Sequence, residues 1–239
     1  MTAKIDAYDD FATTYSDTVK RREEAGIEHE PIMPHFLNLL GDIAGLTILD
    51  AGCGQGYLSR ILASRGAQVT GIDISANLVQ IARAQDPDHT ITYQVANLCQ
   101  PLPAYRQHFD LVASHFVLND VYDYQGFLST LGSVMKSGGR LVLSMNHPYS
   151  LVVRGHVHDY FDTGKPVPYR GLAESGVEVH FYHHTLEEYL DACFAADFQL
   201  HRLLDIPTPI DRTTKLRSDA LMKPGYHFPF FIVLSLIKN

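Results

Sequence analysis

The chain has 239 residues, of which 46% are hydrophobic and 19% charged, a composition typical of a soluble globular protein that argues against wholesale disorder. A length of this order favours one sizeable domain, so we expect a single domain over residues 1–239. The net charge of −8, from 19 lysines and arginines against 27 aspartates and glutamates, argues against a nucleic-acid-binding protein.

The predicted elements begin with a helical cap over residues 1–45, in which apolar residues three and four apart predict a helix from Pro31 to Ile43. Short apolar strands then alternate with amphipathic helices. Predicted strands cover 47–50, 68–73, 90–95, 109–114 and 140–145, and predicted helices cover 56–63, 76–84 (N-capped by Ser75) and 124–135. This alternation predicts a doubly wound, Rossmann-like α/β fold, which binds ligands at the carboxyl ends of its strands.

The alternation stops after the fifth predicted strand. Residues 147–184 are rich in His, Tyr, Gly and Pro and show no clean period, so we expect an irregular, lid-like substrate-binding insert. Thr185-Leu-Glu-Glu188 is a capping-box pattern that predicts a helix to about Ala196. Two further strands are predicted over 199–206 and 226–238.

A glycine-rich loop, Asp50-Ala-Gly52-Cys-Gly54-Gln-Gly56, joins the first strand to the first helix of this alternation. Its third glycine comes one residue earlier than in the dinucleotide pattern G-x-G-x-x-G, and no Lys-Ser/Thr pair follows, so both phosphate-binding interpretations are disfavoured. Asp73 ends the second strand, where a carboxylate can accept hydrogen bonds from ribose hydroxyls. Together these features indicate an adenosine ligand without phosphates.

Four features in order make the sequence resemble the class I S-adenosylmethionine-dependent methyltransferases of the bacterial small-molecule type. They are LDAGCGQG at 49–56, GIDIS at 71–75, FDLV at 109–112 and VMKSGG at 134–139. With the lead segment the resemblance covers about residues 8 to 145. It implies S-adenosylmethionine as cofactor, a methyl-transfer activity, and a seven-stranded sheet whose last strand is antiparallel.

The resemblance also implies a cofactor-binding set: Tyr15, Asp50, Gly52, Gly54, Gln55, Gly56, Asp73, Ile74, Asn97, Leu98, Ser114 and His115. The glycines would leave room for the methionyl part of the cofactor. Asp73 would accept hydrogen bonds from the ribose hydroxyls, and Ile74 would pack on the adenine. Asn97 stands where the family often has Asp, and its amide oxygen could still accept from the adenine amino group. Tyr8 and Tyr15 match a lead helix that often covers the cofactor in such proteins.

The residues that would bind the methyl acceptor are predicted mainly within the insert, residues 147–184. A base is needed only where the acceptor must lose a proton, and histidine suits that role near pH 7. The catalytic candidates are His147, His183 and His115, and the substrate-binding candidates are Arg154, Tyr160, Tyr169, Tyr182 and His183. Phe161 is a further candidate for the apolar wall of the acceptor pocket, and Arg170 is a further candidate to pair with a substrate carboxylate. We therefore expect transfer to N or O of a small molecule.

Several alternatives stay open at this point. A nicotinamide-dependent oxidoreductase is disfavoured by the glycine spacing, and a non-catalytic S-adenosylmethionine-binding protein would keep the same cofactor residues. A metal site is a further alternative, because histidines are common metal ligands and several lie in the insert: His156, His158, His183 and His184. No flanking Cys or Glu pattern indicates that they converge, so no metal site is predicted. Asn146-His-Pro-Tyr149 resembles the N-P-P-Y motif of nucleic-acid methyltransferases, yet follows the wrong strand.

The expected compartment is the cytoplasm, with no membrane partner. The three cysteines, Cys53, Cys99 and Cys193, are odd in number and widely spaced, which is typical of reduced thiols. Residues 1–10 are polar, so no secretory signal is predicted. The longest apolar run, 228–237, is too short to span a bilayer. The oligomeric state is left open, with a homodimer as one candidate.

Overall fold

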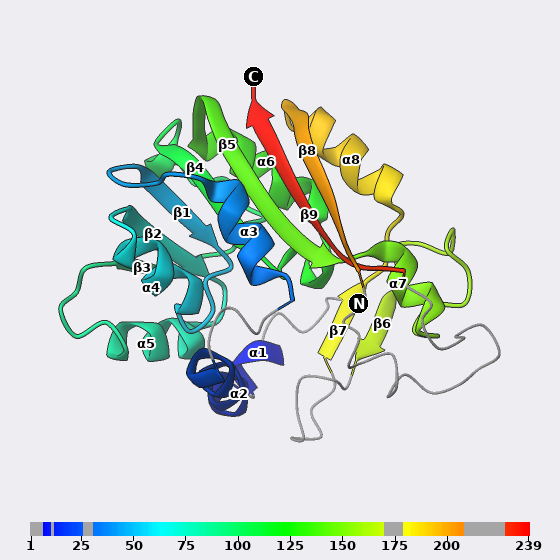
Figure 1. The fold of residues 1–239 in the computed structure, drawn as a ribbon, viewed down its shortest axis with the longest axis horizontal. Helices are drawn as coiled ribbons and strands as arrows, with labels where there is room; N and C mark the ends of the chain where they lie inside the picture. The colour runs from blue at the N-terminus through cyan, green and yellow to red at the C-terminus, as the bar shows by residue number, and fades with distance from the viewer. Residues whose placement is uncertain (1–6, 11, 26–30, 170–178, 208–227) are drawn as a thin grey trace.

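A computed structural model describes residues 7–10, 12–25, 31–169, 179–207 and 228–239 (Figure 1). A seven-stranded sheet has the order β3-β2-β1-β4-β5-β9-β8. Its strands are β1 (Thr47–Ala51), β2 (Gln68–Asp73), β3 (Thr92–Val95), β4 (Phe109–His115), β5 (Met135–Asn146), β8 (Phe198–Pro207) and β9 (Pro229–Lys238). Strands β1 to β5 pair in parallel, whereas β9 is antiparallel to β5 and β8. The predicted fold, with an antiparallel last strand, is confirmed.

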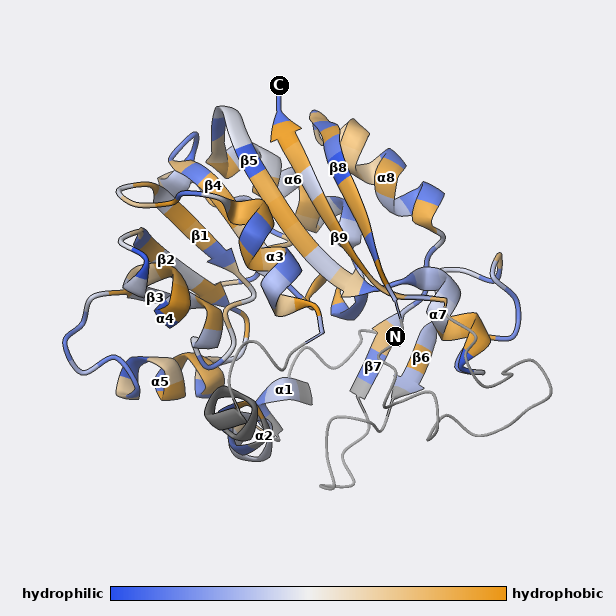
Figure 2. Ribbon diagram, viewed as in Figure 1, coloured by the Kyte–Doolittle hydropathy of each residue, from blue (hydrophilic) through white to orange (hydrophobic). Residues whose placement is uncertain are grey.

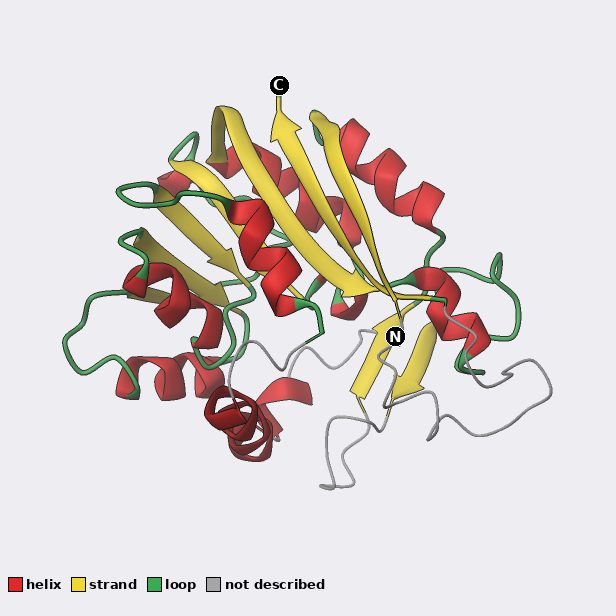
Figure 3. Cartoon of the chain, viewed as in Figure 1, coloured by secondary structure: helices red, strands yellow, loops and turns green. Residues whose placement is uncertain are grey.

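Helices cover both faces of the sheet (Figures 1 and 3). One face carries α3 (Met33–Leu40), α4 (Tyr57–Ser64) and α5 (Ala76–Ala84), and the other carries α6 (Tyr124–Val134) and α8 (Leu186–Ala195). Successive residues of a strand point to opposite faces of the sheet. Ile48 packs in the core that includes α3, α4 and α5, and Leu49 packs in the core that includes α6 and α8, and both are fully buried. Because both faces are covered, the central strands are nearly all hydrophobic, as Figure 2 shows for β5 and β9.

The predicted starts of α5 and α8 are confirmed, whereas α3 is shorter than the predicted helix from Pro31 to Ile43, and α4 begins and ends one residue later than predicted. Ser75 caps α5 by accepting from Leu78 N at 3.2 Å, and Thr185 forms the predicted capping box at the start of α8. Helix α6 ends at Val134, one residue before the prediction, and β5 begins directly at Met135. A register shift against β4 accommodates the first residues of β5, among them Gly138 with a φ of +76°.

The insert is more ordered than expected. The prediction of an irregular segment over 147–184 was wrong in part, because the structure places there α7 (Pro148–Val153) and a hairpin of β6 (Pro166–Tyr169) and β7 (Val179–Tyr182). Prolines at 166 and 168 conceal the strand pattern of β6, since proline is disfavoured within most strands. Strand β7 packs against the 3-10 turn η3 (Leu118–Asp120), which follows β4.

Two short N-terminal helices, α1 (Ala7–Asp10) and α2 (Ala12–Ala25), contact α5. In Figure 1 they lie beyond the carboxyl ends of the parallel strands, the edge near which the β6–β7 hairpin also lies. A second 3-10 turn, η2 (Pro103–Tyr105), precedes β4. None of the helices in the described ranges is long and apolar enough to cross a membrane.

Candidate cofactor and acceptor site

The glycine loop makes a tight turn between β1 and α4. Gly52 has a φ of +78°, its N–H donates to Ile72 O at 2.8 Å, and a Cβ there would stand 2.4 Å from Val117 Cγ2. Only glycine fits both the left-handed backbone and this close approach. A Cβ on Gly54 would stand 3.8 Å from the ring of Tyr15, so that tyrosine lies beside the loop.

Two acidic side chains line the loop. Asp50 is almost fully buried and accepts a hydrogen bond from Ser59 Oγ at 2.6 Å, and burial raises its pKa to about 7. Asp73 accepts from Gly54 N at 2.8 Å and Ser75 N at 2.9 Å, while burial raises its pKa. The carboxylate of Asp73 is therefore held against the glycine loop, at the end of β2 where the sequence predicted it.

Several features of the edge fit an adenosine cofactor with an amino-acid tail. Ile74, which follows β2, is 38% exposed, and Val95, which ends β3, is 43% exposed. These two side chains leave apolar surface for a planar base. In the loop itself, Gln55 is 2% exposed and neither atom of its amide finds a hydrogen-bond partner in the described part of the protein. A buried amide normally has a hydrogen-bond partner, and the amino and carboxylate groups of a methionyl tail could provide one.

Other predicted cofactor residues use their side chains within the protein. Asn97 Oδ1 accepts from Cys99 N at 2.9 Å, which shapes the turn after β3. Ser114 is buried and donates to Ala51 O at 3.1 Å across the sheet. Leu98 packs in the core. Contacts from Ser114 and Leu98 to a cofactor would therefore come from the backbone.

The lead helices are fastened to this edge by side chains that the sequence did not pair. Tyr8 Oη donates to the carboxylate of Asp120 in η3. Asp9 accepts from Ser75 Oγ and from Asn77 N, the latter at 3.0 Å. The rings of Tyr8 and Tyr15 meet edge to face at 5.9 Å. Burial raises the pKa of Asp120 to about 7.

Two of the three candidate histidines are engaged within the fold. His147 caps α7, because its Nδ1 accepts from Tyr149 N at 3.1 Å, and its Nε2 lies 3.5 Å from Asp205 Oδ1. Burial lowers its pKa. His115 ends β4, and its Nδ1 lies 2.7 Å from Ser144 Oγ.

His183 differs from both. It is 1% exposed, and its Nε2 lies 2.8 Å from Tyr160 O. A carbonyl oxygen only accepts, so Nε2 carries the proton and Nδ1 bears a free lone pair. That Nδ1 is buried without a hydrogen-bond partner among the described residues. Nδ1 is therefore the ring atom of His183 that has acceptor capacity left over within the described residues.

The predicted substrate residues of the insert mostly hold it to the body. Tyr160 Oη accepts from Leu186 N at 2.9 Å at the start of α8. Tyr182 is buried, and its ring meets the 70% exposed Tyr122 edge to face at 5.3 Å. The Arg154 guanidinium stacks 4.7 Å from the centre of the Phe230 ring. Phe161 is 78% exposed, so it forms no buried wall.

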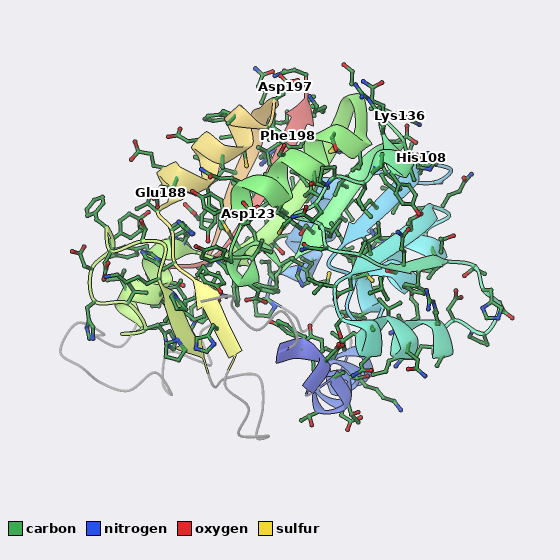
Figure 4. All side chains as sticks on the ribbon, turned by 180° about the vertical axis from the view of Figure 1, so that it is seen from behind. His108, Asp123, Lys136, Glu188, Asp197 and Phe198 are labelled. Carbon is green, nitrogen blue, oxygen red and sulfur yellow. The ribbon has the colours of Figure 1, made fainter. Side chains whose placement is uncertain are left out.

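Two predictions fall outside what the structure describes: the side chain of Tyr169 and all of Arg170. The predicted absence of a metal site stays a prediction, although no group of three or more His, Cys, Asp or Glu suited to a metal occurs within the described ranges. The reverse view in Figure 4 shows Glu188 and Asp123 toward the hairpin end of the sheet and Lys136 and Asp197 toward the opposite end. The ion pairs Lys136–Asp110 and Lys238–Asp197 thus lie away from the site.

Comparisons with known proteins agree with this geometry. Residues 49–143 match the family described as methyltransferase domain. Demethylmenaquinone methyltransferase of Tropheryma whipplei is 41% identical over 116 residues, 48% of each chain. Ubiquinone biosynthesis O-methyltransferase of Coxiella burnetii is 29% identical over 163 residues, 61% of this chain and 69% of that one. The chain thus matches about half the length of the Tropheryma protein.

Solved structures extend the similarity over most of the chain. An S-adenosylmethionine-dependent methyltransferase from Mesorhizobium loti is 26% identical with a TM-score of 0.66, covering 89% of this chain and 100% of that one. The [4+2]-cyclase SpnF shares the fold alone, at 18% identity and a TM-score of 0.59 over 86% of this chain and 80% of that one. One fold therefore serves more than one chemistry, and the acceptor side has to be argued from its own residues.

Proposed function

We propose that this chain, which belongs to the class I S-adenosylmethionine-dependent methyltransferases, transfers a methyl group to a nitrogen or oxygen atom of a small-molecule acceptor. This assignment of the acceptor side rests on the buried Nδ1 of His183, which has no hydrogen-bond partner among the residues that the structure describes. His183 directly follows β7, and β7 packs on the turn η3. That turn follows β4 at the carboxyl ends of the parallel strands, where the cofactor would bind and which we call the cofactor edge.

The cofactor, when bound, supplies a methyl group on a positively charged sulfur, which an attacking atom takes in one displacement. In this proposal the backbone of Gly52 and Gly54 admits its methionyl part, and Asp73 accepts from the ribose hydroxyls. Asp50 faces the amino group, directly or through water. Tyr15, which lies beside Gly54, would cover the bound molecule and exclude water from it. Alignment of donor and acceptor supplies much of the rate of such a displacement.

His183 is assigned as the general base. Its Nδ1 takes the proton of an acceptor hydroxyl or amine, and the resulting imidazolium is stabilised by the Nε2–H donated to Tyr160 O. The Tyr160 carbonyl thereby fixes both tautomer and ring orientation. His147 is assigned a structural role, because the lone pair of its Nδ1 is already used by Tyr149 N–H. His115 is assigned a place beside the methyl group, held by Ser144.

A phenolic, quinone-related acceptor is the best-supported class. Two relatives are named for demethylmenaquinone and for ubiquinone biosynthesis, and the Coxiella protein is named an O-methyltransferase. Tyr182 of the insert and Tyr122, which lies between η3 and α6, pack edge to face at the hairpin, and such aromatic rings suit a planar acceptor. A phenol also needs a base, since it attacks best when ionised. The free cysteines of the described chain fit a reducing cytoplasm, where we place the protein.

The test is S-adenosylhomocysteine release with panels of phenols, amines and carboxylates, using wild type, His183→Asn and His147→Asn. We expect turnover with a phenol, a loss of about a hundredfold in kcat for His183→Asn, and an unchanged affinity for S-adenosylmethionine. His147→Asn, which keeps a capping oxygen, should retain turnover. If cofactor binds and no panel member is methylated, the non-catalytic alternative is favoured. Equal turnover of wild type and His183→Asn would refute the base assignment.

A further inference from the structure

The hydrogen bond from Tyr8 to Asp120 joins residues 112 positions apart at the cofactor edge. Asp120 ends η3, the turn whose preceding residue, Val117, closely approaches Gly52. Tyr8 in turn packs edge to face on Tyr15, the ring beside Gly54. Asp120 is therefore linked to the glycine loop from both sides, through Val117 and through the two tyrosines.

Three carboxylates share this edge and sense one another's charge. The negative charge of Asp73 contributes to raising the pKa of both Asp50 and Asp120, although burial is the larger cause for each. In the described part of the chain, no lysine, arginine or histidine pairs with any of the three. Such a grouping of buried acids is unfavourable until a positive charge joins it.

Among the described residues, Asp120 accepts fewer hydrogen bonds from the protein than Asp73 does, and no more than Asp50 does. Two backbone N–H groups donate to Asp73, and Ser59 donates to Asp50. The side chain of Asp120 accepts from Tyr8 Oη, and no backbone amide of the described residues donates to it. A single hydroxyl therefore compensates the charge of Asp120, a residue of the turn η3 whose preceding residue, Val117, approaches Gly52. A bound cation thus gains more from Asp120 than from Asp73.

The charge of the ligand changes during the reaction. S-adenosylmethionine carries a sulfonium and an ammonium against one carboxylate, whereas S-adenosylhomocysteine has lost the sulfonium charge. We propose that Asp120 is a specificity-determining residue that favours the cationic cofactor over its neutral thioether product, with Tyr8 positioning the carboxylate. The selectivity helps the product to leave and fresh cofactor to enter. The inference rests on the cofactor of the proposed function, and on none of its claims about the acceptor.

Calorimetric dissociation constants test it without any acceptor. The probes are S-adenosylmethionine, S-adenosylhomocysteine and sinefungin, an analogue with an ammonium group in place of the methylsulfonium. Asp120→Asn should weaken S-adenosylmethionine and sinefungin about tenfold, as expected for loss of one partly screened charge, and change S-adenosylhomocysteine by less than about threefold. Asp123→Asn is the matched control, since Asp123 caps α6 at an exposed site and Asn also caps.

Each result is decisive. Equal weakening of charged and neutral ligands by Asp120→Asn would show a merely structural role and overturn the inference, as would no weakening at all. Should Asp120→Asn fail to fold, Tyr8→Phe decides the matter, because it keeps the charge and removes the positioning hydrogen bond. A smaller preference for S-adenosylmethionine in Tyr8→Phe supports the inference, and an unchanged preference overturns it. Wild type that binds none of the probes would instead contradict the cofactor assignment of the proposed function.

Discussion

The side-chain amide nitrogen of Asn119 lies 3.3 Å from the hydroxyl of Tyr189, which itself donates to Tyr182 O at 3.2 Å. Asn119 Oδ1 accepts from Asn146 N at 2.9 Å. One buried asparagine thus connects η3 with the end of β5, with α8 and with the hairpin. Its neighbour Asp120 binds Tyr8. Consecutive residues of one turn therefore fasten the acceptor-side insert and the cofactor-side helices.

Removing the Tyr189 hydroxyl should destabilise the protein measurably. Tyr189→Phe keeps the buried ring but leaves the Asn119 amide and the Tyr182 carbonyl without this partner, so we expect a loss of about 1–3 kcal/mol in free energy of unfolding. Urea titration followed by circular dichroism gives the value. Tyr122→Phe, at a 70% exposed site, is the control and should change it by less than about 0.5 kcal/mol.

Gly52 should not tolerate a methyl group. Gly52→Ala combines a φ of +78° with a Cβ placed 2.4 Å from Val117, so we expect loss of cofactor binding, by at least about a hundredfold, and a lower Tm. Gly45→Ala is a close control, because its φ is also +78° but nothing stands within 4 Å of the added Cβ. Calorimetry and thermal unfolding compare the two variants. Equal behaviour would show that backbone strain, and not the close approach, makes the loop specific for glycine.

Much of the sheet could be predicted because its signals are local. The strand–helix alternation, the Ser75 cap and the Thr185 capping box each depend on residues a few positions apart. The glycine loop is equally local, since its shape follows from its own glycines. Such features are written in consecutive residues, and the structure has them where the sequence indicates.

The rest depends on contacts between distant segments, which no short pattern records. Tyr8 and Asp120 are 112 residues apart, and the tautomer of His183 is set by the Tyr160 carbonyl 23 residues away. The cap formed by His147 on α7 was hidden for another reason, because histidine is an unusual capping residue. The sequence therefore could not distinguish a histidine with an unbonded ring nitrogen from one whose ring nitrogen already accepts a hydrogen bond.

His147 should act through stability and not through turnover. His147→Ala removes the cap of α7, so we expect a loss of about 1 kcal/mol in free energy of unfolding with kcat retained within about threefold. His147→Asn, which can supply a capping oxygen, should recover most of that loss. Denaturation and steady-state kinetics on the same preparations separate the two effects. A large fall in kcat with unchanged stability would instead make His147 the catalytic histidine.

The buried acids predict opposite pH trends for stability and for cofactor binding. Burial raises the pKa of Asp50 and of Asp120 to about 7 in the folded protein, well above the value of an unfolded aspartate. The folded state then binds more protons than the unfolded state between about pH 4 and 7, so stability from these groups is complete below that window and lost as the pH rises through it. The nearby Asp73 acts in the same direction, since its pKa is also raised.

The ligand-free protein should therefore have a lower Tm at pH 8 than at pH 5, whereas affinity for the cationic cofactor should rise over the same range as the carboxylates ionise. Asp120→Asn should make both trends shallower, because an asparagine resembles the protonated acid at every pH while Asp50 and Asp73 still titrate. Thermal scans and calorimetry in buffers matched for ionic strength provide the two curves. If the pH dependences of Tm and of affinity in Asp120→Asn ran parallel to those of wild type, other groups would be responsible for the titration. Asp120 would then not contribute to binding a positive charge at this edge.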